Sequence, residues 1–355
     1  MANKVLVGVS GGVDSSVSAA ILKDKGYEVT GAFMKNWEDD DGTPYCSAKE
    51  DFFDAARVCD KLGIELIQLN FAKEYKEKVF EYFLTSLEDG KTPNPDIFCN
   101  KFIKFEAFYD YAIKNSFDQI ATGHYCQIEK KETLNLLKKS LDQSKDQTYF
   151  LHNINKDVLN NCLFPIGDME KNQVREIAKD KGLITHDKKD STGICFIGER
   201  PFPEFLSNYL PIKKGDIFDE NQNLIGEHNG VYFYTLGQRQ GLGIGGVKGS
   251  LEQPWYVVAK DNQNNSLTVV QDNNHPLLFK SELTVKSINW LVESIPSLKN
   301  ITSKIRYRQN EQVCSLEETS DGWKVLFEKP QRAITPGQSV VFYSGDVCLG
   351  GGEIE

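Results

Sequence analysis

The sequence of 355 residues has no apolar run long enough to cross a membrane, because its longest hydrophobic stretches have only the length of a strand. It also has no CxxC pair. Its eight cysteines are scattered, which excludes the disulfide framework of a small secreted protein and argues against structural zinc. The apolar run near the N-terminus shows no cleavage-site pattern. We therefore expect a cytoplasmic protein without a membrane partner and without a metal centre of its own.

Basic residues are in the minority, with 41 Lys and Arg against 51 Asp and Glu, for a net charge of −10. This balance argues against a general nucleic-acid binder, whose affinity rests on neutralising phosphates. Two local basic clusters remain, and each is either a solvated surface or a face that contacts RNA. They are Lys130, Lys131, Lys138, Lys139 and Lys145 in one stretch, and Lys299, Lys304, Arg306 and Arg308 in the other.

A glycine-rich turn joins an apolar strand, Lys4–Val9, to a helical pattern, Ser16–Lys25. In such a turn successive backbone N–H groups converge on an anion at the positive end of the helix, although a plain tight turn is the alternative. A P-loop needs a lysine where this chain has Asp14, a residue that can instead help to hold the Mg²⁺ accompanying a nucleotide. The predicted phosphate-binding residues are Gly8, Val9, Ser10, Gly11, Gly12, Val13, Asp14 and Ser15.

Strand and helix patterns alternate through the first half, which indicates a parallel sheet with helices on both faces. Ligands of such sheets bind at the carboxyl ends of the strands, so the turn after Val9, Met34 and Thr122–His124 are expected to meet around one nucleotide. The expected strands are Glu28–Met34, Ile64–Phe71 and Gln119–Tyr125, and the expected helices are Ser47–Leu62, Lys73–Leu87, Cys99–Lys114 and Glu170–Lys181.

The pattern changes near residue 200, where prolines and then a glycine-rich run interrupt the chain. Trp255–Gln271 is typical of a hairpin, and short strands separated by turns continue to the C-terminus. We therefore predict an α/β fold with a doubly wound, mostly parallel sheet, followed by a small central domain and a C-terminal β-barrel. The predicted domains are residues 1–199, 200–273 and 274–355.

Two cysteines lie in segments typical of loops that carry reactive side chains. Cys99 follows a loop stiffened by Pro93 and Pro95, and we expect that loop to bring Asp96 and Cys99 to the start of a helix, where a thiolate is stabilised. Cys195 lies among small residues in DSTGICFIG. The alternative is that both are structural thiols. We expect the other cysteines to be core or incidental residues: Cys46, Cys59, Cys126, Cys162, Cys314 and Cys348.

The GxSGGxDS pattern of the glycine-rich turn resembles the PP-loop of the ATP pyrophosphatases, the adenine nucleotide α-hydrolase-like superfamily. Across nearly the whole chain the sequence resembles the tRNA-specific 2-thiouridylases, through GVSGGVDSS, GKTPNPDIFCNKFIKFEAF, ATGHY, KDQTYFL, DSTGICFIGER, TLGQRQGLGIGG, KIRYRQ and PQRAITPGQSVVFY. It departs from that family at Phe102, where a polar residue is usual, and at Cys126 and Gln127 after GHY.

The resemblance implies a role for individual residues. Gly8–Ser15 would bind the phosphates of ATP, Met34 and Gly123 would lie against adenosine, and Cys99 and Cys195 would be the nucleophile and the persulfide carrier. Asp96 would exchange a proton with either the base or a thiol. Contacts to tRNA would come from Asn94, Pro95 and Asp96 at the target base, from Lys145, Asp146 and Gln147, and from Arg306 and Tyr307. Before the resemblance is considered, Tyr307 fits the barrel core as well.

The resemblance also implies a reaction and partners. The C2 oxygen of the wobble uridine in the anticodon arm would be adenylated by ATP, and sulfur from a persulfide would then displace AMP. A cysteine desulfurase or a sulfur relay protein would supply that sulfur, and a transient Cys99–Cys195 disulfide would remain. Two other functions are compatible with a PP-loop. One is an amide ligase, although no glutaminase-like region is visible, and the other is an ATP-gated tRNA-binding or sulfur-relay protein without adenylation chemistry.

Overall fold

The computed structural model describes residues 3–39, 48–190, 193, 202–244, 253–295 and 297–355. Its first part contains a five-stranded sheet in the order β3-β2-β1-β4-β7, and all four pairings are parallel. β1 is central, and all of its residues after Lys4 are buried, as expected for a strand covered on both faces. The strands are β1 (Lys4–Gly8), β2 (Glu28–Lys35), β3 (Glu65–Asn70), β4 (Gln119–Ala121) and β7 (Cys162–Leu163).

Alternate residues of β1 belong to two separate cores. Val5 and Val7 pack with helices α1, α2 and α8, whereas Leu6 packs with the helices that follow β3. The core that contains Leu6 continues into the C-terminal sheet through Tyr343 and Cys348. Among the described residues there is no helix with the length and apolar character needed to span a bilayer. The helices are α1 (Val13–Asp24), α2 (Ala48–Leu62), α3 (Ala72–Tyr75), η1 (Lys76–Phe80), α4 (Glu81–Glu88), α5 (Pro95–Phe98), η2 (Cys99–Ala107), α6 (Phe108–Lys114), α7 (Thr148–Leu151), η3 (Lys156–Asn161) and α8 (Lys171–Asp180).

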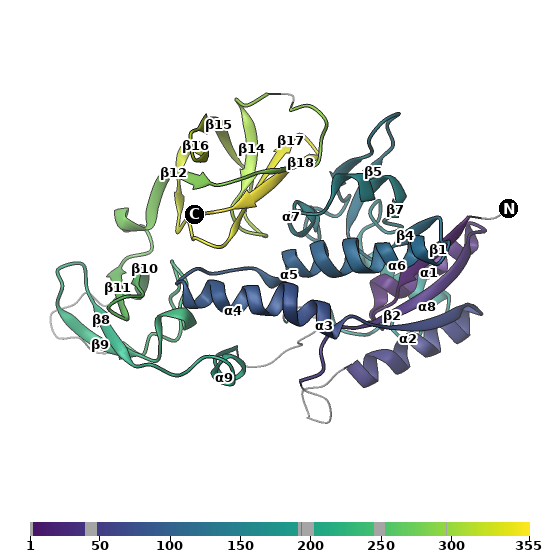
Figure 1. Cartoon of the computed structure of the whole chain (residues 1–355), viewed down its shortest axis with the longest axis horizontal. Helices are drawn as coiled ribbons and strands as arrows, with labels where there is room; N and C mark the ends of the chain where they lie inside the picture. The colour runs from purple at the N-terminus through teal and green to yellow at the C-terminus, as the bar shows by residue number, and fades with distance from the viewer. Residues whose placement is uncertain (1–2, 40–47, 191–192, 194–201, 245–252, 296) are drawn as a thin grey trace.

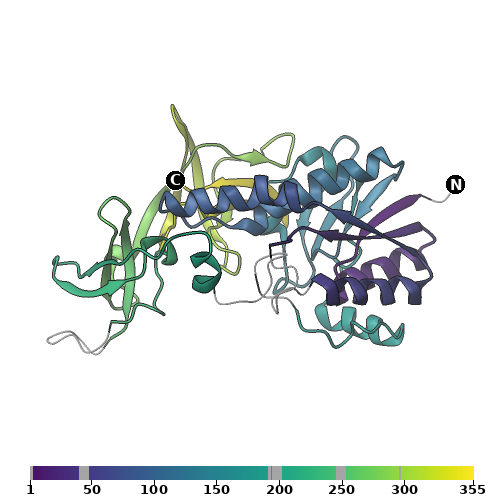
Figure 2. The ribbon, with the colours of Figure 1, turned by 60° about the horizontal axis from the view of Figure 1, so that its bottom comes forward.

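A four-stranded sheet in the order β10-β11-β8-β9 forms the central part, which lies at the far end of the molecule from the N-terminus (Figures 1 and 2). Its β10–β11 hairpin confirms the prediction for Trp255–Gln271. The elements are α9 (Phe202–Ser207), β8 (Gly215–Phe218), β9 (Leu224–His228), η4 (Val231–Phe233), β10 (Trp255–Asp261) and β11 (Ser266–Gln271).

The C-terminal strands form an antiparallel sheet that curls around its own apolar core (Figure 1). The predicted fold class, an α/β sheet followed by a central part and a C-terminal barrel, is confirmed. Its elements are η5 (Pro276–Leu278), β12 (Phe279–Val285), β13 (Asn289–Trp290), β14 (Ile301–Lys304), β15 (Gln312–Thr319), β16 (Gly322–Arg332), β17 (Ser339–Ser344) and β18 (Val347–Glu353).

Two strands from the first half extend this C-terminal sheet. β5 (Cys126–Glu129) and β6 (Leu136–Lys139) form a hairpin, and β6 pairs with β18 at Lys138 and Val347. We call the part of the chain with the parallel sheet the nucleotide part. It is therefore joined to the C-terminal barrel by backbone hydrogen bonds as well as by a common core. The division into residues 1–199, 200–273 and 274–355 stays a prediction, and the β5–β6 hairpin crosses it.

Candidate nucleotide and RNA site

The glycine-rich turn between β1 and α1 has the shape of an anion cradle. Gly12 precedes the helix, and Gly11 has φ +75°, a conformation that favours glycine. Within the turn, Ser15 Oγ accepts a hydrogen bond from Ser10 N at 3.1 Å and donates one to Gly12 O at 3.1 Å. These hydrogen bonds hold the turn in shape from within. The positive end of the α1 dipole lies at the turn.

The three strand ends that the sequence predicted to meet lie together. A Cβ atom on Gly123 would lie 2.7 Å from Ser15 N, so only glycine allows the segment after β4 to approach the turn this closely. On the other side, a Cβ atom on Gly8 would lie 3.1 Å from Met34 Cε. β4 ends at Ala121, earlier than predicted, because the chain turns toward α1 at Gly123. Contact of Met34 and Gly123 with adenosine stays a prediction.

Asp14 has a fixed position beside this cradle. Lys171 Nζ donates to both carboxylate oxygens of Asp14 at 2.8 Å, and Tyr125 OH donates to Oδ1 at 2.9 Å. Burial and the neighbouring Asp14 carboxylate raise the pKa of Tyr125, so its hydroxyl remains a donor. Sequence reasoning missed Lys171; its position at the start of an amphipathic helix was visible, but its partner was not.

Asp190 lies at the other side of Lys171. Its carboxylate accepts from Lys171 at 2.8 Å, from Lys145 at 2.7 Å and from Arg175 at 3.1 Å. Burial raises the pKa of Asp190, but the hydrogen bonds from Lys145 and Lys171 outweigh that effect and bring it to about 2. Asp190 is therefore ionised at neutral pH. Cys195, five positions later, lies outside the described residues, as does Cys46.

The helix that carries Cys99 begins at Pro95, four residues before the predicted start. Asn94 Oδ1 accepts a hydrogen bond from Asp96 N at 3.1 Å, and Pro95 occupies the first helical position. The helical stretch then continues through η2 to the end of α6. The prediction that the loop brings Asp96 to the start of a helix is confirmed, whereas Cys99 lies one turn further along. The field of a helix end falls off within the first turn, and Cys99 lies beyond that turn.

Cys99 is 0% exposed and lies in the core beneath the barrel. Six positions further along the same helical stretch, the ring of Phe105 is 5.7 Å from the ring of His124, next to Gly123. At about 1.5 Å per residue, Cys99 is within roughly 9 Å of Phe105 along the helix axis. The Cys99 thiol is closed to solvent in this conformation.

Asn94 lines a cavity of about 460 Å³ between this helix and the barrel. Lys101 also lines this cavity, and burial lowers the pKa of its ammonium group. Glu353, on the barrel side, accepts hydrogen bonds from Lys91 at 2.9 Å and from Tyr82. The cavity has the volume of a small-ligand site and a polar lining from both parts of the chain.

All three residues of the predicted tRNA segment 145–147 have partners within the protein. Lys145 is paired with Asp190, as described above. Gln147 Oε1 accepts from Tyr125 N at 2.8 Å, which ties the segment to the chain next to the nucleotide turn. The side chain of Asp146 is only 1% exposed. Because that carboxylate is inside the protein, Lys145 and Gln147 are the side chains of this segment within reach of an RNA.

Asp146 belongs to a buried group of charges where the first part meets the barrel. Its carboxylate accepts from Thr148 Oγ1 at 2.8 Å and from Ser140 N at 3.2 Å, and Lys304 Nζ lies 3.8 Å away. Burial raises the pKa of Asp146, against the pull of these partners. Lys304 and Lys139 flank the ring of Tyr343, at 5.3 and 4.6 Å from its centroid. We call Lys139, Asp146, Lys304, Glu311 and Tyr343 the junction cluster.

Arg306 and Tyr307 are both half-buried. Arg306 donates to the backbone oxygen of Leu236 at 3.2 Å and to that of Ala333 at 2.9 Å, so it links the central part to the barrel. The ring of Tyr307 lies 4.4 Å from that of Phe150 in α7. Each side chain therefore has a structural contact as well as an exposed edge. Contact with tRNA at these residues stays a prediction.

The first basic cluster is not a uniform surface. Lys131 and Lys138 both pair with Glu129, and Lys139 is 6% exposed and paired with Glu311. Lys304 of the second cluster is buried in the junction cluster. These pairings reduce the positive charge that either cluster presents to an RNA.

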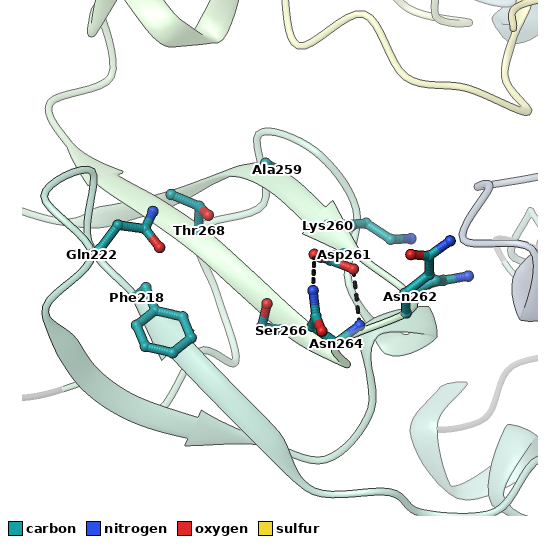
Figure 3. A pocket seen from close by; sticks show the side chains of 10 residues that line it. Phe218, Gln222, Ala259, Lys260, Asp261, Asn262, Asn264, Ser266 and Thr268 are labelled. Atoms are coloured by element: carbon teal, nitrogen blue, oxygen red, sulfur yellow. Dashed lines mark hydrogen bonds between the residues drawn. The ribbon is translucent and has the colours of Figure 1, made fainter.

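A second hollow, of about 660 Å³, lies on the central sheet (Figure 3). It is lined by the β10–β11 hairpin, by Phe218 and by Gln222, and Asp261 accepts two hydrogen bonds from Asn264 in its wall. All of its lining residues come from the central part, so it is separate from the nucleotide turn.

Sequence profiles of three families match consecutive parts of the chain: "tRNA methyl transferase HUP domain" residues 3–199, "tRNA methyl transferase PRC-barrel domain" residues 203–271 and "Aminomethyltransferase beta-barrel domain" residues 280–354. A solved structure of a 4-thiouridine synthetase–RNA complex with ATP matches 58% of this chain and 49% of that chain, at 15% identity and a TM-score of 0.36. A likeness this weak says nothing about function.

Two curated relatives match almost the whole chain. The tRNA-specific 2-thiouridylase MnmA of Stutzerimonas stutzeri (strain A1501) is 56% identical over 99% of this chain and 94% of its own length. The tRNA-specific 2-thiouridylase MnmA of Francisella philomiragia is 56% identical over 99% of both chains. The chain therefore belongs to the family of tRNA-specific 2-thiouridylases.

Proposed function

We propose that this protein replaces the C2 oxygen of the wobble uridine in tRNA with sulfur, with consumption of ATP. The observation that carries the proposal is the 56% identity, over 99% of the chain, with relatives named tRNA-specific 2-thiouridylase. The juxtaposition of the glycine-rich turn with Gly123 and Met34 supports it, because it forms a cradle for an adenine nucleotide at the carboxyl ends of parallel strands. We further propose that the protein works in the cytoplasm.

In this proposal the turn Gly8–Ser15 holds the phosphates of ATP, and Met34 and Gly123 border the adenosine. Asp14 would hold the Mg²⁺ that accompanies ATP, since carboxylate oxygens are ligands that Mg²⁺ prefers. The fit is good in chemistry and position, because the Asp14 carboxylate is 30% exposed at the start of α1. The Asp14 carboxylate would then interact with both the ion and the ammonium group of Lys171.

The chemistry follows from the poor leaving ability of the C2 oxygen. Transfer of AMP from ATP to that oxygen releases pyrophosphate and creates a good leaving group. The terminal sulfur of a Cys195 persulfide, supplied by a donor protein, attacks C2 and expels AMP. Cys99 then attacks the Cys195 sulfur of the bridge, the bridging S–S bond breaks toward the uridine sulfur, and a Cys99–Cys195 disulfide remains for a thiol reductant to reopen.

The target base must leave its stack to reach these groups. We propose that the cavity beside Asn94 gives an extruded nucleotide a place to lie, with Asn94 in its wall. Asp96 would exchange a proton with the base or with a thiol. Because Cys99 is buried in the same helical stretch, we propose that RNA binding is accompanied by a shift of this helix.

We propose that Lys145, Gln147, Arg306 and Tyr307 also contact the tRNA. The buried Asp146 would act through its neighbours, by holding the segment in place from inside the protein. Lys145, Gln147 and Arg306 are half-buried and have partners within the protein. Contacts of these residues with RNA would therefore replace those partners or be added to them.

The test is mass-spectrometric detection of 2-thiouridine in unmodified tRNA incubated with the protein, ATP and a cysteine desulfurase carrying a persulfide. Cys99→Ser and Cys195→Ser are each expected to lower thiolation by roughly 100-fold or more. Cys314→Ser is the matched control: Cys314 is a buried thiol of the barrel whose bond to Ser303 a serine can keep, and full activity is expected.

Pyrophosphate release is measured in the same reactions. Undiminished thiolation in either catalytic variant would remove that cysteine from the mechanism. Pyrophosphate release with a small carboxylic acid and no RNA would favour an amide ligase instead. RNA binding without any release would favour a protein that binds tRNA or relays sulfur without adenylation.

A further inference from the structure

A chain of ion pairs connects the predicted tRNA segment with the glycine-rich turn. Lys145 Nζ lies 2.7 Å from Asp190 Oδ2, Asp190 Oδ1 lies 2.8 Å from Lys171 Nζ, and Lys171 Nζ lies 2.8 Å from both oxygens of Asp14. These four residues are far apart in sequence, at positions 14, 145, 171 and 190. We call Lys145, Asp190, Lys171 and Asp14 the relay.

Lys171 is the shared member of the relay. Its side chain is 11% exposed, and its ammonium group serves two carboxylates at once. Arg175, one turn further along α8, holds Asp190 from the same helix face and also donates to the backbone oxygens of His186 and Lys188. Asp190 therefore has a fixed position and three cations, so a change at one of them alters its attraction for the others.

Three members of the relay are accessible and one is enclosed. Lys145 and Asp190 are each 33% exposed and Asp14 is 30% exposed, whereas the side chain of Lys171 is only 11% exposed. A ligand phosphate can therefore reach Lys145, and a nucleotide with its cation can reach Asp14, while Lys171 stays between the two carboxylates.

We propose that the relay couples RNA binding at Lys145 to nucleotide binding at Asp14, with Lys171 and Asp190 as positioning residues. This inference rests on the proposed function, because it assumes that the two ligands are tRNA and ATP. An RNA phosphate that takes Lys145 leaves Asp190 with fewer cations. Asp190 then draws Lys171 closer, and the Asp14 carboxylate is released toward the cation of the nucleotide.

The sign of the coupling follows from this order of events. RNA strengthens nucleotide binding, and the nucleotide must strengthen RNA binding by the same factor, because linkage is reciprocal. An enzyme built in this way favours ATP when its RNA substrate is in place.

The test measures affinities without turnover. The affinity of the protein for α,β-methylene-ATP with Mg²⁺ is determined by calorimetry, with and without a saturating anticodon stem-loop RNA. In the unchanged protein, RNA is expected to tighten nucleotide binding by roughly fivefold or more. In Asp190→Asn, which keeps the shape but lacks the charge that both lysines share, the ratio is expected to fall to about one while each ligand still binds.

Asp24→Asn is the matched control. Asp24 ends α1 and pairs with Lys181 at the end of α8, so this variant breaks an ion pair between the same two helices away from the nucleotide turn. It is expected to keep the coupling. Should Asp190→Asn fail to fold, Lys145→Gln asks the same question from the RNA end, and saturating RNA must then leave its nucleotide affinity unchanged.

A ratio of one in the unchanged protein, or an unchanged ratio in Asp190→Asn and Lys145→Gln, would overturn the relay and leave the proposed function standing. If the unchanged protein binds neither the stem-loop nor the nucleotide analogue, the proposed function fails, and the relay fails with it.

Discussion

The junction cluster and the relay both contain ion pairs between lysine and carboxylate side chains, but they differ in how much water reaches them. In the junction cluster, Lys139 and Asp146 are 6% and 1% exposed and have hydrogen bonds to backbone or hydroxyl groups as well as ionic partners. In the relay, Lys145, Asp190 and Asp14 are about one-third exposed, and both Lys171 and Asp190 have more than one ionic partner.

This difference suggests different roles. A buried charge that loses its partner has no water to replace it, so the junction cluster holds the barrel in one position on the nucleotide part. A half-exposed charge can exchange one partner for another at little cost. The relay therefore has the physical properties of a connection between ligands, whereas the junction cluster has those of a structural anchor.

The largest effect is expected for Lys304→Met in the junction cluster. The substitution leaves the buried Asp146 carboxylate without its nearest cation, and we expect a loss of roughly 3–5 kcal/mol in the free energy of unfolding. Denaturant unfolding followed by tryptophan fluorescence measures it. The control is Lys324→Met on β16, whose exposed pair with Glu282 at 3.2 Å contributes less than about 1 kcal/mol. Equal losses in the two variants would mean that burial does not distinguish them.

A pH effect of similar origin is expected at His152, which is 1% exposed below the barrel. Burial lowers its pKa to about 4, although its bond to the backbone oxygen of Tyr149 acts in the opposite direction. The folded-state pKa thus lies below the unfolded value near 6.5, so stability is full above about pH 6.5 and declines as the pH falls toward 4. At 1.36 kcal/mol per pKa unit, the decline attributable to His152 is roughly 3 kcal/mol.

Thermal unfolding between pH 4 and pH 7 tests this effect, and His152→Asn should flatten the dependence. His186 makes the same kind of bond, from Nδ1 to the backbone oxygen three residues earlier, but its side chain is 36% exposed. His186→Asn is therefore the matched control for loss of a histidine that is not buried. If the two variants behave alike, the pH dependence does not come from the buried ring.

The smallest stability effect is expected in the relay. Asp190→Asn should cost about 1 kcal/mol or less, because the carboxylate is one-third exposed and water can solvate the cations that it leaves. Denaturant unfolding under the same conditions as for Lys304→Met checks this. A loss as large as that of Lys304→Met would show that Asp190 is an anchor, and the contrast between the two regions would disappear.

Much of the nucleotide part could be predicted from the sequence. The apolar run of β1 predicted a buried strand, and the glycines predicted the turn that follows it, because both signals come from residues adjacent in sequence. The helix start at Pro95 could also have been found, since Asn94 followed by Pro95 is a typical N-terminal signal. We expected the start at Cys99 because the two prolines suggested a loop.

The charged contacts could not be predicted in this way. Lys139 and Lys304 lie in sequence clusters that indicate a basic surface, and their burial depends on strands far apart in the chain. Asp146 was assigned to RNA from the resemblance, but its carboxylate points to the junction cluster. Likewise, no local pattern relates Asp14 to Lys171 and Asp190, because ion pairs between distant segments follow from the fold.

The pairing of β6 with β18 has a practical consequence for work with fragments. Besides the strand pairing, Lys139 N donates to the backbone oxygen of Asp346 at 2.9 Å, and Lys139 Nζ donates to that of Gly345 at 2.8 Å. Removal of the barrel would leave the outer edge of β6 with unsatisfied donors and acceptors beside newly exposed apolar side chains. Such edges recruit other chains, so a truncated nucleotide part is expected to aggregate during expression.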